Sequence, residues 1–188
     1  MKNFFLIVLI FTLALFVAPL SLATGQAKHL SAAPQAASPA VVAKINYTLP
    51  YPGLLPDSPL YFLKQIRDKI LEFLIADPVR KAEFYLLQAD KRLGMGMTLI
   101  DKGKSNLAES TISKGEKYMN LAVTLLSKTK AVGVAVPGEV VDRLSTAIGK
   151  HMEVLNDLIS KANGAVKSGL EGSLSLLEDL QKQVAKMK

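Results

Sequence analysis

The stretch that decides the fold is "DPVRKAEFYLLQADKRLGMGMTLIDK", residues 77–102. Its apolar side chains recur every three or four positions, a period that gathers them on one face of a helix. They are Ala82, Tyr85/Leu86, Ala89, Leu93, Gly96/Met97 and Ile100. Asp77-Pro78 supplies a start, since Asp is a good N-cap and Pro is tolerated at the first helical position. The pattern predicts a helix from Pro78 to about Lys102.

The same period appears in four other segments, joined by short Gly- or Pro-containing connections. The predicted helices are 59–76, 105–130, 139–162 and 168–188. No convincing pair of strands appears. Short connections favour antiparallel neighbours, so we predict an all-α fold: an antiparallel bundle of four to five helices, preceded by a proline-rich extended strap.

Gly94 and Gly96 lie inside the predicted helix of residues 78–102. Each costs roughly 1 kcal/mol relative to Ala in a helix interior. Gly96 falls on the apolar stripe, which favours close approach of a neighbouring helix as compensation. A kink in the helix is the alternative.

The strap, residues 47–58, contains Pro50, Pro52 and Pro56, and Pro59 follows it. Prolines stiffen an extended chain. We expect its large side chains to pack across the bundle, and the alternative is that they recruit a proline-reading domain. These side chains are Tyr47, Tyr51, Leu54 and Leu55.

The first predicted helix runs from Pro59 to about Ala76, with Ser58 as its expected N-cap. Its apolar side chains form one stripe, which we expect to face the bundle. The stripe consists of Leu63, Ile66, Ile70 and Phe73/Leu74.

The N-terminus has a different composition from the rest of the chain. A basic start, the apolar run "FFLIVLIFTLALFV" and the small residues "SLATGQA" are typical of a signal peptide. We predict a signal peptide at 1–23, with cleavage alternatively after residue 27, a flexible Ala/Ser/Pro-rich tether at 24–46 and the helical domain at 47–188. An uncleaved membrane anchor is the alternative, and both interpretations place the domain outside the cytoplasm.

The chain has 188 residues, a formal charge of +7 and no cysteine. The absence of cysteine excludes a disulfide framework and a lipid-modified cysteine anchor. Lys and Arg are spread along the chain without a run of five or six, so most of them are expected on solvated helix faces. Attraction to an anionic envelope surface is the other interpretation, and nucleic acid is not an expected partner of an exported protein.

The inventory of catalytic side chains is small. His151 is the one imidazole in the predicted domain, and no Cys is present. The carboxylates that we considered as acid–base pairs are expected on polar faces as solvated ion pairs: Glu83, Asp90, Asp101, Glu109 and Glu116. No phosphate-binding loop or nucleophile elbow occurs. We therefore predict no enzymatic activity, no catalytic residues and no cofactor.

Soft metal ligands are a separate possibility. Four methionines, together with His151, offer sulfur and imidazole groups that suit copper or zinc. They are Met95, Met97, Met119 and Met152. Methionine at helical spacing more often fills a core, so we assign no metal site and keep a soft-metal carrier as an alternative.

Two motifs carry a family resemblance. "LPDSPLYFLK", residues 55–64, followed by "DPVRKAEFYLLQADKRL", residues 77–93, resembles a bacterial family of exported helical domains of unknown function. The resemblance is good from Tyr47 to about Leu126 and looser beyond. It implies an extracytoplasmic helical module that begins with a proline strap. Gly94 and Gly96 depart from the family pattern, in which Ala or Glu is usual.

The function predicted from the sequence is an exported, non-enzymatic helical module that binds a protein partner or an anionic envelope surface. The alternative is a carrier of a soft metal or a small ligand outside the cytoplasm, held in an apolar groove between helices. The oligomeric state stays open.

Overall fold

The computed structural model describes residues 44–188, so the predicted signal peptide and most of the predicted tether lie outside the described residues. The described part is all-α, as predicted, with five helices and no strand. The helices are α2 (Tyr61–Leu74), α3 (Pro78–Asp101), α4 (Ser105–Ala131), α5 (Gly138–Lys161) and α6 (Gly164–Ala185). No helix among these residues is both long enough and apolar enough to cross a lipid bilayer.

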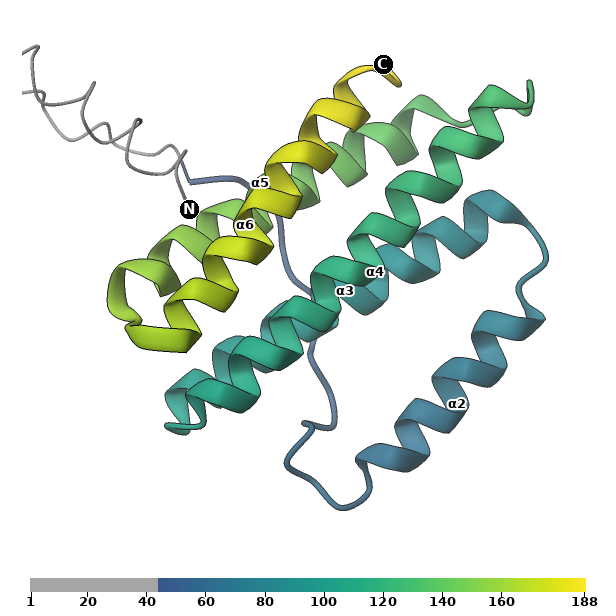
Figure 1. Cartoon of the computed structure of the whole chain (residues 1–188). Coiled ribbons are helices and arrows are strands. Elements are labelled where there is room, and N and C mark those ends of the chain that lie inside the picture. The colour runs from purple at the N-terminus through teal and green to yellow at the C-terminus, as the bar shows by residue number, and fades with distance from the viewer. Residues whose placement is uncertain (1–43) are drawn as a thin grey trace, which may run out of the picture. The chain divides into compact units, whose positions relative to one another are not determined.

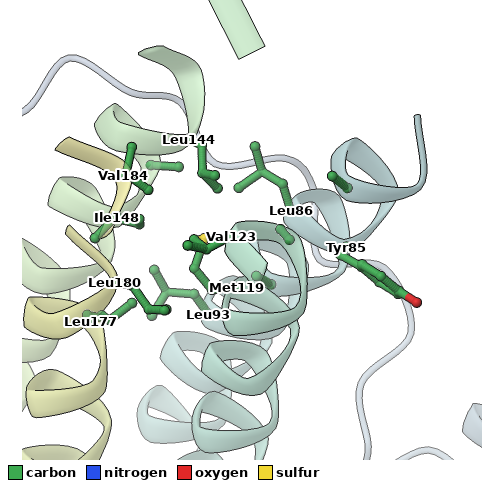
Figure 2. Close-up of a cluster of buried hydrophobic side chains, with 14 of the residues drawn as sticks. Tyr85, Leu86, Leu93, Met119, Val123, Leu144, Ile148, Leu177, Leu180 and Val184 are labelled. Carbon is green, nitrogen blue, oxygen red and sulfur yellow. The ribbon is translucent and has the colours of Figure 1, made fainter. Parts of the chain in front are cut away.

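Four of the helices, α3 to α6, form the bundle. α3 packs on α4 and α5, and α6 packs on α4 and α5. Figure 1 shows these four side by side and α2 set apart from them. Leu93, Met119, Ile148 and Leu177 come from different helices and meet in the core, where each is fully buried (Figure 2).

The predicted start of α3 is confirmed. The Asp77 carboxylate accepts a hydrogen bond from the Arg80 amide at 2.7 Å, and Pro78 occupies the first helical position. This bond satisfies one of the amides that a helix leaves unpaired at its N-terminus.

The expected cap of α2 is wrong. The helix begins at Tyr61, Leu60 occupies the N-cap position and no side chain caps it. The Ser58 hydroxyl instead accepts from the Leu60 amide at 3.3 Å within the preceding turn.

Gly96 has the close approach that its place on the stripe predicted. A methyl group there would stand 2.6 Å from Ile112 Cδ1 and 3.3 Å from the Ala108 carbonyl oxygen of α4. Gly115 of α4 has the reverse relationship, since its missing Cβ would lie 3.0 Å from Arg92 Cβ and 3.2 Å from the Ala89 carbonyl oxygen. Each helix thus has a glycine at a contact with the other, and the two backbones come close together.

The chain before α2 crosses the bundle in extended form. The Ile45 amide donates to Glu153 of α5 at 2.8 Å, and the Tyr47 hydroxyl donates to Asp90 of α3 at 2.6 Å. Side chains at 45, 47 and 49 are partly buried and those at 44, 46 and 48 are exposed, the alternation of an extended chain.

Two of the strap residues that we expected to pack do not do so. Tyr51 is 84% exposed and Leu54 is 43% exposed. Tyr47 and Leu49 are the side chains that pack against the core. Beyond them, Asp57 pairs with Lys102 and Lys104 at the turn between α3 and α4.

The expected orientation of α2 is also wrong. All five residues of its apolar stripe are exposed: Leu63, Ile66, Ile70, Phe73 and Leu74. The face toward the bundle is polar: Asp68 is the one buried residue of the helix, and Lys64 and Glu72 flank it at one-turn spacing. Amphipathicity was read correctly from the sequence, but the apolar stripe is not buried in the core: all of it is exposed, and Ile66, Ile70 and Phe73 line an open groove beside α3 and α4.

Candidate functional site

His151, the imidazole singled out from the sequence, is completely buried in α5. Its Nδ1 atom lies 2.9 and 3.1 Å from the two carboxylate oxygens of Glu116 in α4. Its Nε2 atom lies 3.0 Å from Asp90 Oδ1 in α3. The second oxygen of Asp90 accepts the Tyr47 hydroxyl. One buried polar network therefore joins the strap to three helices.

The pKa of His151 is set by two opposing effects. Burial lowers it, but the negative charge of Glu116 and the hydrogen bonds to Asp90 and Glu116 outweigh burial and raise the pKa to about 9. His151 is thus a cation at neutral pH and donates from both ring nitrogens. Burial is also the main reason that the pKa of Tyr47 is raised, and its bond to Asp90 adds to the effect.

This arrangement corrects the expectation for two carboxylates. Asp90 and Glu116 were expected on solvated faces, yet they are 4% and 0% exposed. Glu83 pairs with Arg143, and Glu109 accepts from the Ser113 hydroxyl. No pattern in the sequence indicates that Asp90, Glu116 and His151 meet, because they come from three helices with no common motif.

The network is built to hold helices together. Both nitrogens of His151 are occupied, and its carboxylate partners lie on opposite edges of the ring, so the three groups do not converge on one point. No group of three His, Asp or Glu side chains among residues 44–188 has an arrangement that would hold a metal ion. The network's buried, charge-assisted hydrogen bonds connect α5 to α3 and α4.

The methionines considered as soft ligands are dispersed. Met95 and Met119 are fully buried and Met152 is partly buried. Met97 was expected on the inward stripe of α3 but is 38% exposed. Met95, which lies outside the predicted stripe, is buried instead. The buried surface of α3 is wider than that stripe because the helix is covered on several sides.

A groove of about 670 Å³ lies between α2 and the bundle. Four apolar side chains from α2 line it together with Arg92 of α3 and Tyr118 of α4. The four are Phe62, Ile66, Ile70 and Phe73. Its volume is within the range of small-molecule sites. The groove runs beside the polar side of α2, which has ion pairs within the helix and one hydrogen bond to α3.

Those polar contacts are specific. Asp68 accepts from Lys64 at 3.0 Å and from Arg67 at 2.7 Å. Burial raises the pKa of Asp68, but these bonds outweigh it and hold the pKa below its usual value. Glu72 accepts from Lys69 at 2.9 Å and from the Tyr85 hydroxyl at 3.0 Å. In Figure 2 that hydroxyl is directed away from the apolar cluster.

Arg92 is the functional candidate that the sequence reading missed. It is 6% exposed, and its guanidinium lies 4.2 Å from the centre of the Tyr118 ring. Its Nη1 atom donates to the Gln88 carbonyl at 3.0 Å and to Gln88 Oε1 at 2.7 Å. Gly115 on the α4 stripe was a usable signal, because a glycine there leaves room for the stem of a long side chain on α3.

The described residues form a small all-α domain. A family model described as "Domain of unknown function (DUF5667)" matches residues 53–165, more than half of the chain. The chain belongs to this family, in agreement with the resemblance noted in its sequence. The match runs from the strap through α5. No curated protein and no solved structure matches the chain.

Proposed function

We propose that this chain is a non-enzymatic module that acts outside the cytoplasm and attaches to an anionic membrane surface through α2. The observation that carries the proposal is the outward apolar face of α2, on which Phe73 is 86% exposed and Leu74 is 67% exposed. Burying one such side chain fully contributes about 1.5–3 kcal/mol. An exposed face of this kind marks a surface that another apolar phase covers.

The charges on α2 favour a negatively charged surface. The exposed cations Arg67 and Lys69 are bonded to Asp68 and Glu72, and the carboxylate of Asp68 is turned inward and buried. The cations are thus more accessible than the carboxylates: their side chains are 61% and 71% exposed, against 7% and 22%. A helix with Phe, Leu and Ile on one face and accessible cations beside it is typical of interfacial binding.

Two further features support the proposal. The predicted N-terminal signal or anchor directs the chain to a membrane, and the overall charge is +7. The imidazole of His151 is closed off between two carboxylates, an arrangement suited to structure rather than to turnover.

Vesicle co-sedimentation tests the proposal with the chain that begins at Thr24, because every contact described here lies at or beyond residue 45. We expect binding to phosphatidylglycerol vesicles and much weaker binding to phosphatidylcholine vesicles, with the difference reduced at high salt. The double variant Leu63→Ser/Leu74→Ser should lose binding.

The matched control is Val132→Ser/Val134→Ser, which removes two exposed apolar side chains from the loop between α4 and α5. It should bind vesicles like the unmodified chain. Equal loss in both double variants, or no binding to either vesicle, would contradict the proposal. A chain that ignores vesicles but captures a protein through Leu63 and Leu74 would favour the protein-partner alternative instead.

A further inference from the structure

Arg92 is a buried cation without an anionic partner. Among the described arginines, Arg67 and Arg143 pair with carboxylates, and both are more exposed than Arg92. No Asp or Glu oxygen among residues 44–188 comes within 4.0 Å of the Arg92 guanidinium, which donates from Nη1 to the carbonyl and side-chain oxygens of Gln88. A buried charge without a counter-ion is costly, so an anion that reached Arg92 would be stabilised there.

Two hollows beneath α2 share Arg92, Tyr118 and Gln65. One is the groove with the apolar wall of α2. The other has Lys114 and Lys117 among its lining residues. Asp68 and Lys69 also line the groove, and the carboxylate of Asp68 is already bonded to Lys64 and Arg67 of α2. The surroundings of Arg92 are therefore positive on one side and apolar on the other.

We propose that the groove between α2 and the bundle binds a single-chain acidic amphiphile, with its anionic head on Arg92 and its alkyl chain along the apolar side of α2. Charge complementarity selects the head group, since Arg presents a planar fork that suits carboxylate and phosphate. The apolar wall of Phe62, Ile66 and Phe73 selects an alkyl chain over an inorganic anion. This discrete site goes beyond attachment of α2 to a surface.

Calorimetric titration of the chain that begins at Thr24 tests the proposal. The probes are dodecanoate, dodecyl phosphate and dodecanol, each as monomers below its aggregation limit. We expect one molecule of dodecanoate or dodecyl phosphate to bind per chain, and dodecanol to bind at least about 10-fold more weakly because it lacks the charge. Comparable binding of the two anions would indicate recognition of charge, and a preference for the phosphate would indicate a lipid-derived head.

Arg92→Gln should abolish the preference for dodecanoate over dodecanol, and Arg92→Lys should retain part of it because the charge remains. Phe73 and Leu74 provide a matched pair that cannot disturb the core, since both side chains are more than half exposed. Phe73→Asp places a negative charge on the groove and should weaken dodecanoate binding by about 10-fold. Leu74→Asp makes the same charge change outside the groove lining and should leave the affinity unchanged.

The proposal is overturned if dodecanol binds as tightly as dodecanoate, if Arg92→Gln keeps the preference, or if the two Asp variants weaken binding equally. It is also overturned if neither dodecanoate nor dodecyl phosphate binds. The two proposals fail separately: Leu63→Ser/Leu74→Ser should keep dodecanoate binding, and Arg92→Gln should keep vesicle binding.

Discussion

Gly96 of α3 lies against Ile112 of α4, so closely that any Cβ at position 96 would overlap the Ile112 side chain. Ile112 is fully buried and has no free space to move into. The contact explains why a residue that weakens an isolated helix occupies the middle of α3. The free energy that α3 loses in helix propensity is offset by closer packing with α4.

Gly96→Ala should lower the free energy of unfolding by about 1–2 kcal/mol, because overpacking exceeds the gain in helix propensity. Gly94→Ala is the control, since its Cβ would meet Pro52 Cβ at 3.6 Å, an ordinary contact. It should raise stability by about 0.5–1 kcal/mol. Denaturant unfolding measures both, and a stabilised Gly96→Ala variant would show that the two helices separate easily.

The buried network predicts how stability depends on pH. The pKa of His151 is about 9 in the folded chain against 6.5 for the free side chain, so folding favours the protonated form. This contribution is complete below pH 6.5 and is lost as the pH rises to about 9. The groups that face His151 are Asp90 and Glu116, with Tyr47 bonded to Asp90 and Arg143 close enough to act on Tyr47.

We expect the free energy of unfolding to fall by about 3 kcal/mol between pH 6.5 and 9.5. Glu116→Gln removes one of the two negative charges and should shift the loss to lower pH. Titration of the imidazole by NMR gives the midpoint directly, with His29→Ala used to assign the signal of His151. A midpoint near 6.5 would contradict the network as described.

Tyr47→Phe should lower the free energy of unfolding by about 1–3 kcal/mol, because it removes the hydroxyl that donates to the buried carboxyl group of Asp90. Tyr51→Phe makes the same chemical change four residues later at an 84% exposed side chain and should be neutral. Thermal unfolding distinguishes them. If the two variants melt together, the attachment of the strap to α3 does not contribute to stability.

Asp77→Ala should cost about 1 kcal/mol, since it removes the side-chain cap of α3. Asp101→Ala at the other end of the same helix is the comparison. A carboxylate near a helix C-terminus is unfavourable, so this change should be neutral or slightly stabilising. Equal destabilisation by the two changes would mean that the Asp77 cap contributes nothing specific.

The extent of the helices could be predicted from local patterns. Asp77-Pro78 fixed the start of α3, and four of the five helices begin within two residues of the expected position. The exception is α6, which begins at Gly164 rather than near residue 168, so only two residues separate it from α5. Of the residues that its pattern places inward, Leu170, Leu177, Leu180 and Val184 are buried and Leu174 is partly buried.

The predictions that failed concern which residues contact one another, not the spacing of apolar residues along each helix. A period identifies the apolar face of a helix but not what covers it. α2 contacts the bundle through its polar side, where Glu72 accepts from the Tyr85 hydroxyl of α3. Polar positions such as Asp90 and Glu116 resemble solvated residues when each helix is viewed alone. They become buried because α3 and α4 are covered on more than one side.

The sequence by itself determined the all-α class, the helix limits apart from the start of α6, and the family, and it favoured close approach at Gly96 over a kink. These features depend on spacing within a few turns or on motifs. Tertiary structure alone decided that His151 joins Asp90 and Glu116, that α2 turns its apolar side outward and that Arg92 is buried without a carboxylate. Those relationships join residues up to 61 positions apart. Burial and charge pairing at such separations depend on how helices meet, which no local period encodes.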